Sequence, residues 1–455
     1  MKIAKYQFNI IRLLLAGIVL WSCDDYLAVK PDAALAVPNS VKDYQALVDY
    51  QVRMNELYPA AGDVAADYYF LNDADWEAIR DESRATYIWE PTAENEQDWR
   101  LAYETVFYAN VILDGIDDAA LDGLRETDRQ HVKGSGFFIR GWTFYQLAQL
   151  FAPPYIPGDE QNEYGIPLRL TSDINESTRR ATVGETYRQI EADLKSAARL
   201  LPPRAVLATR PSKMAAYAAL SRMYLIMQRY EESLAYADSC LSIQSDLLDF
   251  NQLDTLADNA FGTLNKEVLF TALLTTYPLA HESARARVDT ALIRSYQPGD
   301  LRLPIFFTTR PDSSWRFKGS YEGSNYGVFA GLATDEVYLN KAEALIRLGQ
   351  WQEGLAVLDK LLVTRHQTGR YEPADVDNGE AALYLVLQER RKELIFRGGV
   401  RWSDLRRLNM EERFETTLTR MIGGELYTLP PGDPRYTFLI PSNVINLSGI
   451  KQNPR

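Results

Sequence analysis

Seven basic and three acidic side chains fall within twenty residues near the C-terminus, in the stretch QERRKELIFRGGVRWSDLRR from Gln388 to Arg407. Such a cluster could bind a phosphate or a nucleic acid, because anion binding is driven by clustered cations. It could also form an ion network inside the protein, since one guanidinium group can hold carboxylates and backbone carbonyls at once. The formal net charge of the chain is −13, which argues against nucleic acid as the main partner.

The arrangement of these charges favours the internal network. Acidic residues interleave with the arginines instead of leaving a run of one sign. The apolar spacing predicts a helix from about Ala381 to Arg397, which the pair Gly398-Gly399 should end, and then a short helix that carries Trp402 and Leu405 inward. We therefore predict a lock that fastens the C-terminal helices to the remaining scaffold.

Catalytic chemistry has little support in the sequence. The three histidines, His131, His281 and His366, do not lie in a zinc-protease HExxH pattern, and neither a G-x-S-x-G motif nor a P-loop is present. The chain has 62 acidic residues, so carboxylate pairs are inevitable and carry no information. We expect a protein that is not an enzyme and that uses no metal and no cofactor.

Aromatic residues offer a binding chemistry instead. Residues 50–98 and 245–333 are rich in rings but lack sustained helical periodicity, and loops on a rigid scaffold often carry binding residues. Aromatic rings can stack on the apolar face of a sugar while polar side chains bind its hydroxyls. The candidate ligand-stacking residues are Trp76, Tyr296, Trp315 and Tyr321, for which plain loop packing is the open alternative. The tryptophans on helical patterns are expected in the core: Trp99, Trp142, Trp351 and Trp402.

A repeat defines the elements that would position these loops. Segments that start at Tyr217 and Tyr338 match in register with an offset of 121 residues, and apolar residues in both step by four, three and four. A third copy of the second helix runs from Ile190 to Leu201. Small residues at the helix contacts and an aromatic residue at the start of the second helix are similar to the tetratricopeptide (TPR) pattern. We expect helix pairs that stack, separated by long insertions.

The N-terminus is typical of an exported lipoprotein. Residues 1–22 hold Lys2, Lys5 and Arg12 and then an apolar run too short to span a bilayer, as in a signal peptide. Leu20-Trp21-Ser22-Cys23 resembles the lipobox, in which the cysteine becomes the acylated N-terminus. We therefore predict a signal peptide at 1–22, lipidation at Cys23, and a tether and lead-in over 23–45.

Several motifs together resemble the SusD-like (RagB/SusD) family of nutrient-binding outer-membrane lipoproteins. The resemblance covers essentially the whole chain after the leader, including the arginine-rich stretch, whose signature positions here are Glu389, Arg390, Glu393, Arg401, Trp402, Asp404 and Arg406. The other matching motifs are CDDYLAVKPD, DWRLAYETVFYANVIL, GFFIRGWTFYQLAQLFAPPYIP, DEVYLNKAEALIRLG and FLIPSNVINLSGIKQNP.

This resemblance implies a fold and a function. The fold would be mainly α: TPR-like helix pairs as a scaffold, beside a loop-rich lobe with short strands, in one domain over 46–455 whose halves meet near residue 245. The protein would be lipid-anchored at the outer membrane, would face the exterior, and would cap a SusC-type TonB-dependent transporter to which it delivers a glycan or another nutrient. The alternative is a TPR-type peptide-binding adaptor on the outer membrane, which should need neither the aromatic lobe nor the anchor.

Overall fold

The repeat in the sequence is a repeat of helix pairs. In the computed structural model, which describes residues 38–275, 284–324 and 327–455, helix α11 spans Lys213–Ile226 and α15 spans Thr334–Arg347, so both bounds differ by the predicted 121 residues. Their partners, α12 (Tyr230–Ile243) and α16 (Trp351–Leu362), begin at the two aligned aromatic residues.

The turns inside these two pairs are also equivalent. Gln228 and Gly349 occupy the same position in the repeat, and both have left-handed backbone, with φ of 59° and 83°. Glycine adopts this conformation at no steric cost, whereas glutamine does so against its preference. The shared geometry shows that the turn, rather than the residue type, is the constant feature of the repeat.

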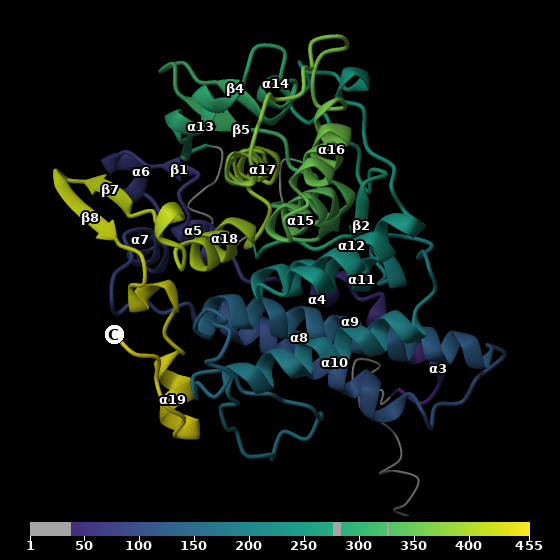
Figure 1. Cartoon of the computed structure of the whole chain (residues 1–455). Coiled ribbons are helices and arrows are strands. Elements are labelled where there is room, and N and C mark those ends of the chain that lie inside the picture. Colours follow the sequence, from purple (N-terminus) through teal and green to yellow (C-terminus); the bar gives the residue numbers. More distant parts are fainter. Residues whose placement is uncertain (1–37, 276–283, 325–326) are drawn as a thin grey trace, which may run out of the picture.

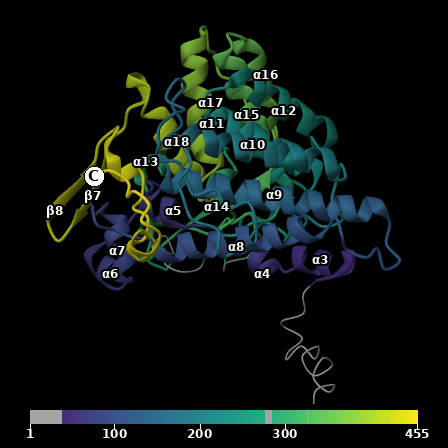
Figure 2. The same ribbon diagram turned by 90° about the horizontal axis from the view of Figure 1, so that it is seen from below.

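A third pair, α9 (Glu126–Phe151) and α10 (Val183–Leu200), extends the stack as predicted. Helix α8 (Glu96–Gly115) packs on α9, α10 packs on α11, and α12 packs on α15. Figure 1 shows this succession rising from α8–α10 through α11 and α12 to α15 and α16, and Figure 2 gives the view from below. The helix pairs therefore form the predicted scaffold.

Short elements make up the second, loop-rich part, which lies at the upper end in Figure 1. Its strands form two-residue to three-residue ladders, and a longer hairpin lies near the C-terminus. The four sheets found among the described residues are all two-stranded and antiparallel. The strands are β1 (Tyr69–Phe70) with β3 (Arg287–Val288), β2 (Val268–Phe270) with β6 (Leu332–Ala333), β4 (Phe307–Thr309) with β5 (Trp315–Phe317), and β7 (Leu418–Ile422) with β8 (Glu425–Leu429).

The remaining helices are mostly short. They are α3 (Val41–Val48), α4 (Gln51–Met54), α5 (Ala61–Ala65), α6 (Asp73–Glu77), α7 (Asp81–Tyr87), α13 (Thr290–Ser295), α14 (Arg302–Phe306), α17 (Gly379–Glu393), α18 (Val400–Leu408) and α19 (Ser442–Ser448). The described part of the chain is thus mainly α with only short strand pairs, and the predicted fold class is confirmed.

Three groups of buried apolar residues form the core. The largest joins the N-terminal helices to α8–α12, a second fills the loop-rich lobe, and a third lies between α15, α16 and α17. The second group is dominated by aromatic side chains, among them Tyr68, Phe250 and Phe306. The aromatic richness of the lobe therefore serves its packing first, because each large ring removes much apolar area from water.

The C-terminal helices differ from the prediction in one respect. Helix α17 ends at Glu393, four residues before the predicted end at Arg397, and the chain turns at Phe396, whose φ is 48°. Gly399, with φ of 75°, instead forms the N-cap of α18. The glycine pair thus starts the second helix, while the first helix has already ended.

The predicted leader, the predicted lipidation site Cys23 and most of the predicted tether lie outside the described residues. The folded body begins earlier than the predicted residue 46, because Val41 and Tyr44 of α3 are buried in the main core and Ser40 caps that helix. Within residues 38–275, 284–324 and 327–455, no helix is both long enough and apolar enough to cross a membrane.

Candidate functional site: the aromatic lobe and the charges beneath it

The arginines of the C-terminal stretch are paired inside the fold. Arg390 donates from Nε to Asp404 Oδ2 at 2.8 Å and from Nη1 to Asn340 Oδ1 at 2.8 Å. Arg407 also pairs with Asp404, at 2.8 Å, and donates two hydrogen bonds to Glu343 of α15. These contacts fasten α17 and α18 to the helix-pair scaffold, which is the predicted lock.

The other signature residues extend this lock to the N-terminal half. Arg401 donates to both oxygens of Asp67, at 2.7 and 2.8 Å. Arg406 donates to the backbone carbonyls of Gln149 and Ala152 at the end of α9, and its burial lowers its pKa to about 10. Trp402 is 1% exposed and stacks on Phe438 with 5.4 Å between ring centroids.

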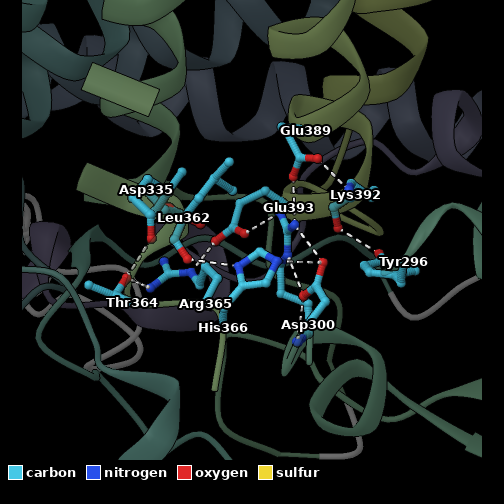
Figure 3. A network of polar contacts seen from close by, with 12 residues as sticks. Tyr296, Asp300, Asp335, Leu362, Thr364, Arg365, His366, Glu389, Lys392 and Glu393 are labelled. Carbon is cyan, nitrogen blue, oxygen red and sulfur yellow. Dashed lines mark hydrogen bonds and ion pairs between the residues drawn. The ribbon is translucent and has the colours of Figure 1, made fainter. Parts of the chain in front are cut away.

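Glu389 and Glu393 belong to a second buried network, under the loop-rich lobe. Arg302 donates to Glu389 at 2.6 Å and to Glu393 at 3.2 Å, and Arg365 donates to Glu393 at 2.7 Å. Figure 3 shows Arg365 beside Glu393, and Lys392 between Glu389 and Tyr296. Arg302 and Arg365 come from segments distant in sequence, and no local pattern identified them as partners. An anion site in this stretch is not supported, because the arginines and the lysine are already paired.

Two of the candidate ligand-stacking residues are part of this interior. Tyr296 is 7% exposed and donates to the carbonyl of Lys392 at 2.8 Å. Tyr321 is 1% exposed, donates to Glu267 at 2.8 Å and lies under the guanidinium of Arg397. Their rings leave no face for a sugar, so the structure corrects the prediction for these two tyrosines.

The two candidate tryptophans lie differently. Trp76 of α6 and Trp315 of β5 are both half-buried: each packs on the aromatic core of the lobe and keeps part of its ring at the surface. The indole of Trp76 donates to the carbonyl of Arg84, whose guanidinium lies 5.4 Å from the ring centroid. Both rings are therefore held by the lobe without being enclosed by it.

One arginine connects the segments that carry these tryptophans. Arg287 of β3 pairs with Asp75, next to Trp76, at 2.5 Å, and with Asp312, in the turn before Trp315, at 3.1 Å. β3 also pairs with β1, which leads into α6, and packs against β5. The structure thus brings Trp76 and Trp315 onto the same part of the lobe from segments more than 200 residues apart.

The tryptophans expected in the core are mostly there. Trp142 and Trp402 are 0% and 1% exposed, and Trp99 is 6% exposed, whereas Trp351 is half-buried at the start of α16. Trp99 also lines a surface cleft along α8, which helical periodicity could not reveal because the opposite wall comes from a loop. Among the described residues, no group of three or more histidine, cysteine, aspartate or glutamate side chains is placed to hold a metal ion.

Comparisons with known proteins agree with this architecture. The crystal structure of a SusD superfamily protein from Bacteroides thetaiotaomicron matches 91% of this chain and 100% of its own, with 20% identity and a TM-score of 0.74. A putative sugar binding protein from Bacteroides vulgatus matches 92% of this chain and 99% of its own, with 21% identity and a TM-score of 0.75. A laminarin binding SusD-like protein matches 92% of this chain and 99% of its own, with 16% identity and a TM-score of 0.66.

Family models identify both halves of the chain. A model described as "Starch-binding associating with outer membrane" matches residues 25–225, and a model described as "SusD family" matches residues 334–430. A search of curated proteins finds no match. The two model matches include the helix-pair scaffold except for α12, which lies between them, and the arginine-rich stretch with its internal ion pairs. The chain belongs to the SusD-like family.

Proposed function

We propose that this protein is a glycan-binding lipoprotein of the outer-membrane surface that binds its ligand without chemical conversion. The observation that carries the proposal is the pair of half-buried tryptophans, Trp76 and Trp315, on the same part of the lobe, whose segments are joined through Arg287. Indole rings stack on the C–H faces of sugars, and the nearby charged side chains can bind hydroxyls. The sugar-binding and laminarin-binding relatives and the starch-binding family model support this ligand class.

The remainder of the proposal follows from the family. The protein would be anchored by acyl chains at Cys23, would cap a SusC-type TonB-dependent transporter and would deliver the glycan for uptake. Several acyl chains suffice to keep a protein on a membrane without a spanning helix. A peptide-binding adaptor built on the helix pairs is the less favoured function, because it gives no role to the half-buried tryptophans of the lobe.

Binding is tested by screening the purified protein on a glycan array and then titrating the best ligand into variants. Trp76→Ala and Trp315→Ala should each weaken binding about tenfold, which corresponds to ~1.4 kcal/mol. Trp351→Ala, which changes a half-buried ring on α16 outside the lobe, is the matched control and should bind normally. Equal affinity in all three variants would rule out the tryptophan surface as the ligand site.

Delivery is tested separately by mild solubilisation of outer membranes and affinity capture of the protein. A large barrel protein should co-purify in stoichiometric amount, and a Cys23→Ala variant should appear in the soluble fraction. Recovery of the membrane-bound protein without any barrel would contradict the transporter-cap role, whatever the outcome of the glycan array.

A further inference from the structure

The proposed function makes no use of a surface cleft that lies along helix α8. The cleft, of about 240 Å³, opens along α8, which occupies the lower part of Figure 1, whereas β4 and β5 lie in the upper part. Its floor is a stripe of three rings spaced four residues apart, Trp99, Tyr103 and Phe107, which share one face of the helix. Phe107 is 39% exposed and Tyr103 is half-buried, whereas Trp99 is 6% exposed, so the rings accessible to a ligand are those of Phe107 and Tyr103.

The opposite wall is polar and comes from the loop 167–178. The loop residues that line the cleft are Pro167, Arg169, Thr171, Ser172, Asp173, Ile174 and Thr178, and Val444 of α19 closes one side. The cleft thus places aromatic side chains opposite hydroxyl and carboxylate groups, which is the composition of small-molecule sites in proteins.

Hydrogen bonds to α8 hold this wall in place. Tyr103 donates to the carbonyl of Pro167 at 2.7 Å, and buried Asn110 donates to the carbonyls of Arg169 and Thr171 at 2.9 and 3.0 Å. Asp114 accepts from both the backbone and the hydroxyl of Ser172, at 2.7 Å each. The cleft is therefore formed in advance, so a ligand would not have to order the loop on binding.

The loop and α8 are in turn fixed to α9 and α10. Arg140 donates to Asn110 at 3.0 Å and to the carbonyl of Leu170 at 3.1 Å, and it forms a buried ion pair with Asp193 of α10 at 2.7 Å. Asn110 thus stands between the loop and a buried charge pair. This second layer of contacts keeps the distance between the aromatic floor and the polar wall constant.

The chemistry of the lining selects one class of ligand. The guanidinium of Arg169 is engaged by the carbonyls of Asp173 and Glu176, at 2.6 and 2.5 Å, so the cleft offers no free cation to an anion. The hydroxyls of Thr171 and Ser172 already donate to Glu176 and Asp114, at 3.2 and 2.7 Å, so they can accept hydrogen bonds from the hydroxyl groups of a ligand. A sugar ring satisfies both walls, because it has C–H faces for the aromatic stripe and hydroxyls for the loop.

We propose that this cleft is a separate saccharide subsite, which accepts a single ring or the end of a glycan chain. Its volume is below the ~300–1,000 Å³ of pockets for drug-sized molecules, so a long oligosaccharide would enter only by one end. The subsite is independent of Trp76 and Trp315. A glycan held on the lobe and one held in the cleft would be bound at two positions of the same molecule, which raises avidity for long chains.

Fluorine NMR of the full protein labelled with 5-fluorotryptophan tests the subsite directly, because the chain has only eight tryptophans. The Trp99 signal, assigned with a Trp99→Phe variant, reports the cleft, and the Trp76 and Trp315 signals report the lobe. The probes are the methyl glycosides of glucose, galactose, mannose, xylose and N-acetylglucosamine, each added up to saturation or solubility. At least one probe should shift the Trp99 signal in a saturable way.

Two variants and a control complete the experiment. Phe107→Ala should weaken binding of the glycoside that shifts the Trp99 signal about two- to tenfold, as expected for the loss of one ring contact. Thr171→Val should also weaken its binding, because it removes a hydroxyl from the polar wall. Tyr384→Ala removes an equally exposed ring on α17, at 40% exposure, and should have no effect. The proposal is overturned if no glycoside shifts Trp99, or if both variants respond like the parent; neither result depends on the lobe signals.

Discussion

Arg390 and Asp404 face each other across the junction of α17 and α18, with Nε and Oδ2 2.8 Å apart and both side chains buried. Asp404 also accepts from Arg407, and the two arginines hold its pKa below the ordinary value despite the burial that opposes them. One carboxylate therefore compensates two buried guanidinium groups. Loss of the Asp404 carboxylate should therefore weaken the internal lock.

Asp404→Ala should lower the free energy of unfolding by about 3–5 kcal/mol, because it leaves the buried guanidinium of Arg390 without a carboxylate partner. Urea denaturation followed by circular dichroism measures the change. Glu163→Ala, which removes the partner of Lys451 in a pair whose side chains are 69% and 67% exposed, is the control and should change stability by less than ~1 kcal/mol. Lost glycan binding by a fully stable Asp404→Ala protein would instead indicate a ligand site.

A pair of buried carboxylic acids should make stability depend on pH in the neutral range. Asp98 accepts from the backbone of Ala60 and Ala61 at the start of α5, and Asp63 of α5 accepts from the backbone of Gly399 before α18. Burial raises the pKa of each to about 7. The folded state therefore retains protons that the unfolded chain releases near its ordinary value of 3.8.

Because the folded state keeps these protons longer than the unfolded state, the stability of the fold should fall as pH rises. As pH rises from about 4 to about 7, the unfolded state loses the proton first, so each group makes the folded state less stable by up to ~1.4 kcal/mol per pH unit. Asp63→Asn removes one titrating group and should flatten the decline of stability over this window. Asp118→Asn, at an exposed position, is the control. An equal slope of stability between pH 5 and pH 7 in the parent and in Asp63→Asn would contradict the account.

The sequence predicted the scaffold well for a physical reason. Helix pairs have local periodicity, so the offset between Tyr217 and Tyr338 was enough to place four helices, and α11 and α15 coincide with it at both ends. The structure of the lobe is harder to predict from the sequence, because its contacts join residues that are distant in the chain. Tyr296 and Tyr321 lack helical spacing, yet each is buried by segments distant in the chain.

The partners of the buried charges and the walls of the cleft are also non-local, so the sequence revealed only part of each. Interleaved signs between Gln388 and Arg407 correctly indicated an internal network, but its partners Arg302 and Arg365 could not be found, since isolated arginines carry no spacing signal. The stripe from Trp99 to Phe107 is visible in the sequence, but a stripe alone also describes a core helix. Only the position of the loop 167–178 distinguishes the two.

Arg287 should control ligand binding without touching the ligand. Its ion pairs with Asp75 and Asp312 hold the segments of the two candidate tryptophans together, so Arg287→Ala should separate them and weaken glycan binding about tenfold. Arg316→Ala, which removes a longer and more exposed pair with Asp258 at 3.3 Å, is the control in the β4–β5 hairpin that carries Trp315. Calorimetric titration of both variants decides the point, and unchanged affinity of Arg287→Ala would show that the rings are positioned by packing alone.

Gly398 should be intolerant of even one added carbon. A Cβ at this position would lie 2.6 Å from Cβ of Ala330 and 2.7 Å from Cδ2 of Leu274, and the backbone of Gly398 is held by a 2.8 Å hydrogen bond to the carbonyl of Phe329. Because both neighbours are buried, the clash cannot be relieved at the surface, and Gly398→Ala should cost about 1–3 kcal/mol. Gly262→Ala meets no atom within 4 Å and is the matched control. Equal midpoints of urea denaturation for the two variants would mean that the loop before α18 can shift, and the tight approach of the signature stretch to the core would then not be required for stability.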